Sequence, residues 1–328
     1  MHDFTILVLP GSFAASVALT VDILAAAAAT TLQVGGPVPR WRVLCVGGPE
    51  VALSNGMSIA GKSLPKSVKP DKSIWIIPGL GLSRESALKE RLGRQDALQA
   101  IRAIKAHSRA GGVIAASCSS VFLLQAAGIL AGKKVTTTWW LASHLRRSEP
   151  ACTVDADRMV IDDGKIITAG AALAQTDLML HLLRTRFGAL LSDAVGRVML
   201  IDARQAQAPY IVPAMLAMGN TLVAQLTAYV EEALPVMPKM AKLAEKFCIS
   251  ERTLARHIQS ATGRSPMALL QSIRVNKARM LLESSKLSVG EIAARVGYGD
   301  ATALRRLMRK TTGATPRQFR STRILQAV

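Results

Sequence analysis

Cys118 is the side chain that the sequence places best for covalent chemistry. It follows an apolar run at residues 112–116, which we expect to be a buried strand, and precedes an apolar helix over residues 121–127. A sharp strand-to-helix turn exposes a side chain at the carboxyl edge of a sheet and points backbone N–H groups at a bound anion or carbonyl. The helix N-terminus can also lower the pKa of such a thiol. This spacing alone indicates a nucleophilic cysteine.

The other cysteines and the histidines add neither a metal site nor a disulfide framework. Cys45, Cys152 and Cys248 are scattered without CxxC or Cys/His spacing. His107 and His144 are distant candidates for the base that a thiol nucleophile needs, but ordinary surface or structural roles are favoured for both. We therefore expect no metal, no cofactor and a reducing compartment.

Arginines at helical spacing form the second chemical signature. Ser250 can cap a helix over residues 251–261, whose outer face carries Arg252 and Arg256. Arginine binds guanine through two parallel hydrogen bonds and also pairs with phosphate. A short helix over residues 239–247 precedes this basic helix. Two short helices joined by a tight turn, with the second basic on its outer face, predict a helix-turn-helix at residues 239–262.

The same arrangement returns further along the chain. Ser288 caps a short helix over residues 289–295, residues 297–299 form the turn, and Asp300 opens the next helix. That helix carries Thr302, Arg305, Arg306, Arg309 and Lys310. This repetition predicts a second helix-turn-helix at residues 288–312, with the helix from Pro266 to Glu283 joining the two units.

The charge distribution supports a polyanionic partner. The chain carries a formal net charge of +19, and residues 235–328 hold 18 Lys and Arg against 5 Asp and Glu, a net of +13. Clustering of this kind is rewarded by release of counterions from nucleic acid. The N-terminus lacks the features of a signal peptide, and no uninterrupted apolar run approaches the ~18 residues of a membrane span. A soluble, cytoplasmic protein is expected.

Alternating strands and helices must position Cys118. Short apolar runs end at Gly or Pro, and amphipathic segments follow them, so we expect a parallel sheet covered on both faces. The predicted strands are residues 4–9, 41–46, 73–77, 112–116 and 165–168. The fold class is α/β, with a doubly wound parallel sheet over residues 1–204, a connector at 205–220, and an all-α domain with two helix-turn-helix motifs over residues 221–328.

The C-terminal residues resemble the AraC/XylS regulators. The resemblance is carried by residues 243–245, 250–256, 262–266, 274–282, 292–298 and 313–316. It implies that both recognition helices enter successive major-groove segments about 34 Å apart. The base-facing candidates it implies are Arg252, Ala255, Arg256, Thr302, Arg305 and Arg306, and Thr253 and Arg309 complete the DNA-binding set. A phosphate contact or a solvated position on the helix surface is an equal alternative for any one of these arginines. Leu304, Leu307 and Met308 stand where the family commonly has aromatics, which should loosen the packing.

The N-terminal residues resemble the PfpI-like branch of the glutamine-amidotransferase superfold, with its flavodoxin-like sheet. The resemblance spans roughly residues 4–187 and is carried by residues 9–11, 77–79, 116–124 and 127–139. Active members pair the elbow cysteine with a histidine and an acidic residue of the first helix. Here Ser119 follows the cysteine, Asp22 stands where a glutamate is usual, and Thr138 stands where related regulators often have histidine. The resemblance therefore implies an incomplete hydrolytic site.

The two resemblances together match the architecture of GlxA-type regulators, whose sheet domain is thought to dimerise and to sense a small molecule. They share the connector motif at residues 207–210. We expect Asp22, Gly79, Cys118 and Ser119 to form an effector pocket, for which the resemblance implies a nitrogen metabolite. A packing elbow without a ligand is the alternative.

The sequence thus predicts a homodimeric transcriptional regulator that binds double-stranded DNA and a small-molecule effector, without membrane association or enzyme activity. A cysteine-dependent amidase or hydrolase with an accessory DNA-binding module is the competing hypothesis, because the elbow around Cys118 also suits nucleophilic catalysis.

Overall fold

The computed structural model describes residues 2–68, 71–202, 204, 206–207, 221–312 and 315–320. The chain divides into two compact units, residues 1–205 and 206–328. Of the connector expected at 205–220, only residues 206 and 207 lie among the described residues. Each unit is described by itself.

The N-terminal unit is built on a seven-stranded sheet in the order β10-β11-β7-β6-β1-β2-β5. Its strands are parallel except for β10, which runs antiparallel to β11. The strands are β1 (Phe4–Val8), β2 (Trp41–Cys45), β5 (Lys62–Ser63), β6 (Ile74–Ile77), β7 (Ile114–Ser117), β10 (Val160–Asp163) and β11 (Ile166–Ala169). The predicted parallel sheet is confirmed. The pairs β3 (Glu50–Ala52) with β4 (Ser58–Ala60) and β8 (Lys134–Val135) with β9 (Thr153–Val154) were not predicted.

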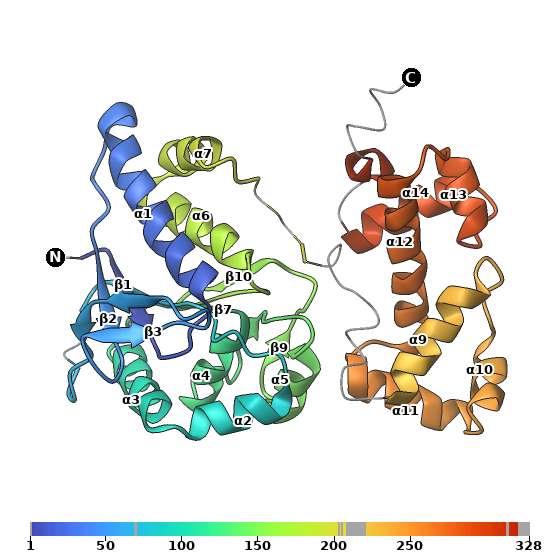
Figure 1. Cartoon of the computed structure of the whole chain (residues 1–328), viewed down its shortest axis with the longest axis horizontal. Helices are drawn as coiled ribbons and strands as arrows, with labels where there is room; N and C mark the ends of the chain where they lie inside the picture. The colour runs from blue at the N-terminus through green and yellow to red at the C-terminus, as the bar shows by residue number, and fades with distance from the viewer. Residues whose placement is uncertain are drawn as a thin grey trace. The chain divides into compact units, whose positions relative to one another are not determined.

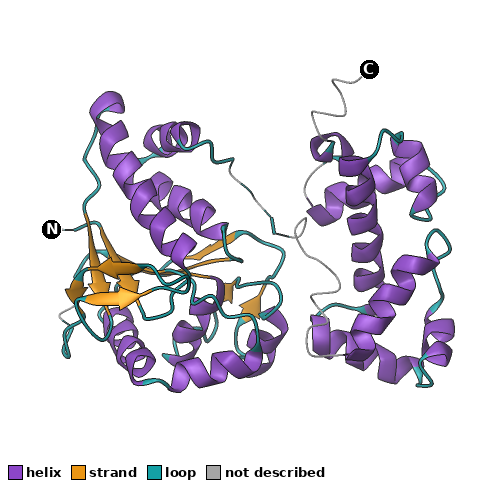
Figure 2. Cartoon of the chain, viewed as in Figure 1, coloured by secondary structure: helices purple, strands orange, loops and turns teal. Residues whose placement is uncertain are grey.

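Helices cover both faces of this sheet (Figures 1 and 2). The helices on one face are α1 (Ala14–Val34), α6 (Ala174–Phe187) and α7 (Ala189–Val198). Those on the other are α2 (Glu85–Gly93), α3 (Gln95–Arg109), α4 (Val121–Ala126) and α5 (Ala142–Ser148). Successive side chains of a strand point to opposite faces of a sheet. In β1, Phe4, Ile6 and Val8 accordingly pack in the core under α1, α6 and α7, whereas Leu7 packs in the core under α2 to α5. All five β1 residues are consequently buried.

Helix α1 is long and mostly apolar. It has 21 residues and an 18-residue window with a mean hydropathy of 1.7, so by length and composition alone it could cross a membrane. In the structure its buried face packs into the core beneath the sheet, through residues that include Ile23, Leu24 and Ala27. The same apolar length is typical of a core helix.

The C-terminal unit is helical. It comprises α9 (Thr221–Ala233), α10 (Met240–Lys246), α11 (Glu251–Thr262), α12 (Pro266–Ser284), α13 (Val289–Arg295), α14 (Ala301–Thr312) and the short 3₁₀ helix η3 (Pro316–Phe319). Helix α12 contacts α9, α11, α13, α14 and η3, so it organises the whole unit. Leu304, Leu307 and Met308 of α14 are all buried in one core with Ile292 and the partly buried Phe319. Aliphatic side chains therefore fill the positions where looser packing was expected.

Candidate DNA-binding surface and cysteine elbow

The first helix-turn-helix is formed by α10, a turn and α11. The Ser250 hydroxyl accepts a hydrogen bond from the Thr253 backbone N–H at 3.1 Å and so caps α11, as the sequence predicted. Thr253 is half-buried and its own hydroxyl also contacts Ser250, which ties this predicted DNA contact to the cap. Leu254 and Ile258 are fully buried.

The outer face of α11 carries the predicted base-reading residues. Arg252 and Arg256 are exposed, and Ala255 between them is half-buried. Neither arginine forms an ion pair with another of the described residues. Both guanidinium groups are therefore available to a partner at the N-terminal half of the helix, which is the part of a recognition helix that contacts base edges.

The second helix-turn-helix begins with a capping box at α13. The Ser288 N–H donates to Glu291 at 2.7 Å, and the Glu291 N–H donates back to the Ser288 hydroxyl at 3.2 Å. The hydrogen bond from the Ser288 backbone is the main reason that the pKa of Glu291 is lowered. Reciprocal bonds of this kind satisfy two backbone donors that the first turn would otherwise leave free.

The turn of this second unit is closely packed. Gly297 has φ +80°, in the left-handed region that favours glycine, and a Cβ added there would lie 2.3 Å from the Pro235 carbonyl oxygen. Next to it, the Arg274 guanidinium of α12 lies over the Tyr298 ring at 4.7 Å. The turn is thus held by both α12 and the segment after α9.

Helix α14 presents a strongly basic outer face. The Asp300 carboxylate accepts hydrogen bonds from the N–H groups of Ala303 at 2.8 Å and Thr302 at 2.6 Å, which lower its pKa and start the helix. The exposed residues of the helix include all the candidates predicted there: Thr302, Arg305, Arg306 and Arg309, together with Lys310. These cations line a groove of about 1070 Å³ between α14 and η3.

The two recognition helices pack against one scaffold. Figure 1 shows α11 and α14 near opposite ends of α12, and both contact it. Helix α12 has 19 residues and is therefore about 28 Å long. This length is comparable to the ~34 Å of one turn of B-form DNA.

Cys118 occupies the predicted strand-to-helix elbow but is not exposed. It follows β7 and opens a single 3₁₀ turn, η1 (Cys118–Ser120), with φ +55°, a strained backbone region for a residue with a Cβ. Its side chain is 5% exposed. A Cβ added at Gly79 would lie 2.9 Å from the Cys118 Cβ, so only glycine allows this close approach. The geometry was predicted correctly, whereas the exposure was not.

The expected lowering of the thiol pKa is wrong. Burial raises the pKa of Cys118, and this effect outweighs the hydrogen bonds from the Ala172 backbone and from Ser119 that lower it. The Thr138 hydroxyl is buried beside the thiol and makes no hydrogen bond of ordinary geometry to a described residue. The Ser119 hydroxyl accepts the Leu82 N–H at 3.3 Å. The elbow is thus a hydroxyl-lined environment that disfavours the thiolate.

Three of the four residues expected in an effector pocket come together, and Asp22 does not join them. Gly79, Cys118 and Ser119 are neighbours, as described above. Asp22 is exposed on α1, and no hydrogen bond or ion pair joins it to another described residue. Helix α1 instead reaches the loop between β11 and α6 through Ser16, which donates to the Ala172 carbonyl at 3.4 Å.

Neither candidate histidine serves the thiol. His107 is fully buried and stacks on Trp75 with ring centroids 4.6 Å apart, and burial lowers its pKa. His144 pairs with Glu85 at 3.1 Å and lies against the Phe122 ring. The structural roles favoured from the sequence fit both side chains.

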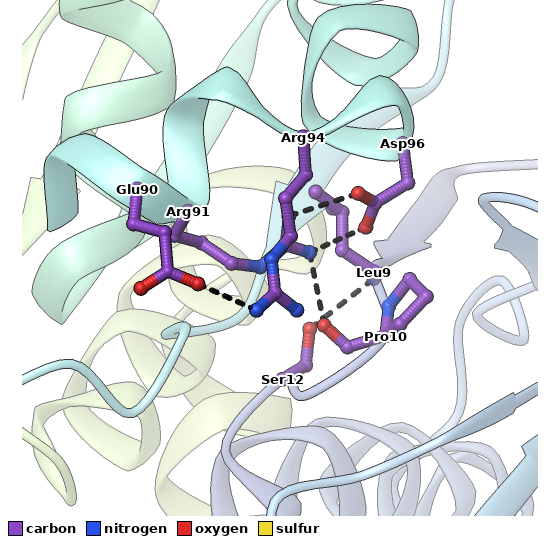
Figure 3. A network of polar contacts seen from close by, with 7 residues as sticks. All are labelled: Leu9, Pro10, Ser12, Glu90, Arg91, Arg94 and Asp96. Carbon is purple, nitrogen blue, oxygen red and sulfur yellow. Dashed lines mark hydrogen bonds and ion pairs between the residues drawn. The ribbon is translucent and has the colours of Figure 1, made fainter. Parts of the chain in front are cut away.

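An ion pair between the buried Arg91 and the partly buried Asp96 lies beside the loop after β1, where the strand order reverses between β1 and β6. Figure 3 shows the Arg91 guanidinium reaching Asp96, at 2.6 and 3.1 Å, and the Pro10 carbonyl, at 2.9 Å. Arg91 is 7% exposed. Beside it lies a groove of about 660 Å³ lined by Gly47, Lys66, Gln95, Asp96, Gln99 and Arg102. Sequence reasoning missed this network, because its partners come from different helices and a loop backbone and share no motif.

Comparison with known proteins agrees with this division of the chain. Residues 39–185 match the DJ-1/PfpI family, and residues 243–322 match a helix-turn-helix domain. The chain joins a DJ-1/PfpI domain to an AraC-type helix-turn-helix domain. The expected recognition of both parts is confirmed.

Sequence similarity to known regulators extends over most or all of this chain. The HTH-type transcriptional regulator CdhR of Pseudomonas aeruginosa is 26% identical, covering 99% of this chain and 94% of that protein. The regulator GlxA of Rhizobium meliloti is 27% identical, covering 88% and 89%. An AraC family transcriptional regulator from Pseudomonas putida has a crystal structure that aligns with a TM-score of 0.50 at 17% identity, over 61% of this chain and 100% of that chain, which shows the shared fold.

Proposed function

We propose that this protein is a transcriptional regulator that binds duplex DNA with one recognition helix in each of two successive major-groove segments. The observation that carries the proposal is the pair of exposed, arginine-bearing helices α11 and α14 packed on a single α12. An α12 about 28 Å long suits two sites that are ~34 Å apart, because the side chains of both recognition helices extend the reach. One chain would then contact two half-sites.

Base reading in the first unit falls to Arg252 and Arg256, which lie in the first and second turns of α11. Arginine at these positions suits guanine O6 and N7, and Ala255 between them suits the methyl group of thymine. In the second unit Thr302 and Arg306 take the corresponding places, and Arg305 and Arg309 flank them. Thr253 remains in the set of proposed DNA-binding residues, and its role there is to hold the N-terminal cap of α11 through Ser250.

The DJ-1/PfpI domain serves to sense a small metabolite and to form a homodimer in the cytoplasm. The proposed effector site surrounds Gly79, Cys118 and Ser119, where backbone N–H groups and hydroxyls converge. A nitrogen metabolite is the ligand class that the family resemblance favours. Dimerisation would place two C-terminal units on one DNA and raise their effective concentration there.

Enzyme activity is not part of the proposal. A nucleophilic cysteine acts as the thiolate, and burial raises the pKa of Cys118 without a histidine partner among the described residues around it. The strained elbow geometry is the one feature that favours the hydrolase alternative. Amide turnover that disappears in Cys118→Ala would establish that alternative, and equal inertness of both proteins would remove it.

The test of DNA binding is a gel-shift titration with a duplex from upstream of the protein's own gene, against a duplex of the same length and shuffled sequence. At ~150 mM salt we expect the upstream duplex to bind at least tenfold more tightly, since specific complexes exceed nonspecific ones by ~10³-fold or more when the operator is complete. Equal affinity for the two duplexes would refute sequence-specific regulation through this DNA.

A further inference from the structure

The groove between α14 and η3 contains far more positive charge than base reading requires. Six of the residues that line it are cations: Arg305, Arg306, Arg309, Lys310, Arg317 and Arg320. The other described residues that line it are Val289, Thr302, Thr315 and Pro316, and none of them is acidic. We propose that this groove seats the sugar-phosphate backbone of DNA, with Arg317 as a phosphate contact opposite Arg309. The inference rests on the proposed function.

The η3 wall of the groove is held firmly in place. The Thr315 N–H donates to Gln318 Oε1 at 2.7 Å, and the Gln318 N–H donates to the Thr315 carbonyl at 3.0 Å. Arg320 donates to the carbonyls of Ser285 at 3.4 Å and Leu287 at 2.5 Å, between α12 and α13. A wall fixed in this way presents its exposed cation at low conformational cost on binding.

Apart from the electrostatic attraction between Arg306 and Asp300, the remaining cations have no ion-pair partner among the described residues. Arg305, Arg306, Arg309, Lys310 and Arg317 are exposed, and none forms an ion pair with a described residue. Carboxylates at ion-pair distance would have to be displaced before phosphate could bind. Without them, phosphate meets unpaired guanidinium groups, which bind it with two parallel hydrogen bonds.

The internal repeat provides a comparison within the same chain. Residues 263–266 after α11 correspond to residues 313–316 after α14, so Met267 corresponds to Arg317 and Leu270 to Arg320. Met267 is 61% exposed and uncharged, and Leu270 is buried. Helix α11 exposes two arginines beside the anionic Glu251, whereas α14 exposes four cations. The second recognition helix therefore presents more positive charge to a polyanion than the first.

The experiment compares wild type with Arg317→Met, which gives the second unit the residue that the first unit has. Affinity for the upstream duplex and for a shuffled duplex is measured by fluorescence anisotropy from about 50 to 200 mM salt. Each phosphate contact contributes ~0.9 to the slope of log K against log salt. We expect Arg317→Met to reduce the slope by ~0.9, so that affinity falls about 3.5-fold less than in wild type over this range.

Controls separate this effect from charge and folding. Arg109→Ala removes an exposed cation from α3 and should leave the slope unchanged, as should Met267→Ala in the first unit. Arg309→Ala should reduce the slope as Arg317→Met does, and far-UV circular dichroism checks that each variant is folded. Weakening by the same factor on both duplexes supports the groove as a phosphate site.

Three outcomes would overturn the inference. An unchanged slope in a folded Arg317→Met, with wild type binding DNA normally, refutes the phosphate contact alone. A loss confined to the upstream duplex makes Arg317 a base-reading residue instead. Failure of wild type to bind either duplex refutes the groove and the proposed function together.

Discussion

Substituting Gly297 with alanine should destabilise the second helix-turn-helix specifically. The residue has φ +80°, and the added Cβ would lie 2.3 Å from the Pro235 carbonyl oxygen, a backbone atom that cannot rotate away. The left-handed conformation costs alanine ~1–2 kcal/mol, and overpacking a filled site costs ~1–3 kcal/mol. The stiffer unfolded chain returns ~0.4–1 kcal/mol, which leaves a net loss of about 1–5 kcal/mol.

The positions of the tryptophans allow the unfolding of the two units to be followed separately, and Gly290 provides a control substitution. All four tryptophans, Trp41, Trp75, Trp139 and Trp140, lie in the N-terminal unit, so their fluorescence follows that unit, while far-UV circular dichroism follows the helices of both. In urea unfolding, Gly297→Ala should move the midpoint of a circular dichroism transition to a lower urea concentration. The midpoint of the fluorescence transition should not change. Gly290→Ala is the matched control, because its Cβ would meet only Ser288 Oγ at 3.8 Å within a helix.

We expect Gly290→Ala to gain up to ~1 kcal/mol from helix propensity. If Gly297→Ala were as stable as Gly290→Ala, the close approach of the turn to Pro235 would be absent in solution and the packing argument would be wrong. A shift of the fluorescence transition would show instead that the two units do not unfold independently.

Three further predictions concern binding, acid stability and thiol reactivity. Arg256→Ala should cost about 1–3 kcal/mol of operator binding and relax preference at one base pair in a selection from randomised duplexes, whereas a uniform loss on all sequences would make it a phosphate contact. Backbone hydrogen bonds at helix N-termini lower the pKa of Glu291 and Asp300, so their stabilisation is present above the unfolded pKa and is lost as pH falls through the lower folded pKa. Urea unfolding between neutral pH and about pH 3 should therefore show a smaller acid loss in Glu291→Gln than in wild type, and equal losses would contradict the assignment. Iodoacetamide near neutral pH should modify the exposed Cys248 before the buried Cys118, as followed by peptide mass spectrometry, and the reverse order would show that the elbow opens in solution.

The helix-turn-helix units could be predicted from sequence because their signals are local. Ser250 and Ser288 cap their helices as expected, and the periodic apolar residues Leu254 and Ile258 are buried. Capping and periodicity depend on neighbours within a few residues, which a sequence displays directly. Such signals also located the strand-to-helix turn at Cys118.

The environment of Cys118 could not be predicted, because distant segments create it. Gly79, Thr138 and the backbone of Ala172 surround the thiol from three separate loops, and burial raises its pKa although the contacts of Thr138 and Ala172 lower it. The prediction that Asp22 joins the effector pocket was wrong for a related reason. The family resemblance suggested this residue, but it is Ser16 of α1 that contacts the loop of Ala172, and Asp22 is exposed. Which side of a helix faces a site is set by tertiary packing.

If one chain binds DNA as proposed, the continuous helix α12 also limits which promoters it can recognise. Both recognition helices pack against the same 19-residue helix, so the distance between them cannot increase to match a longer spacer in the DNA. Adding about five base pairs would rotate one target segment to the opposite side of the double helix, out of reach of the same molecule. Operators for this protein should therefore tolerate single base substitutions far better than changes in the spacing between the two target segments.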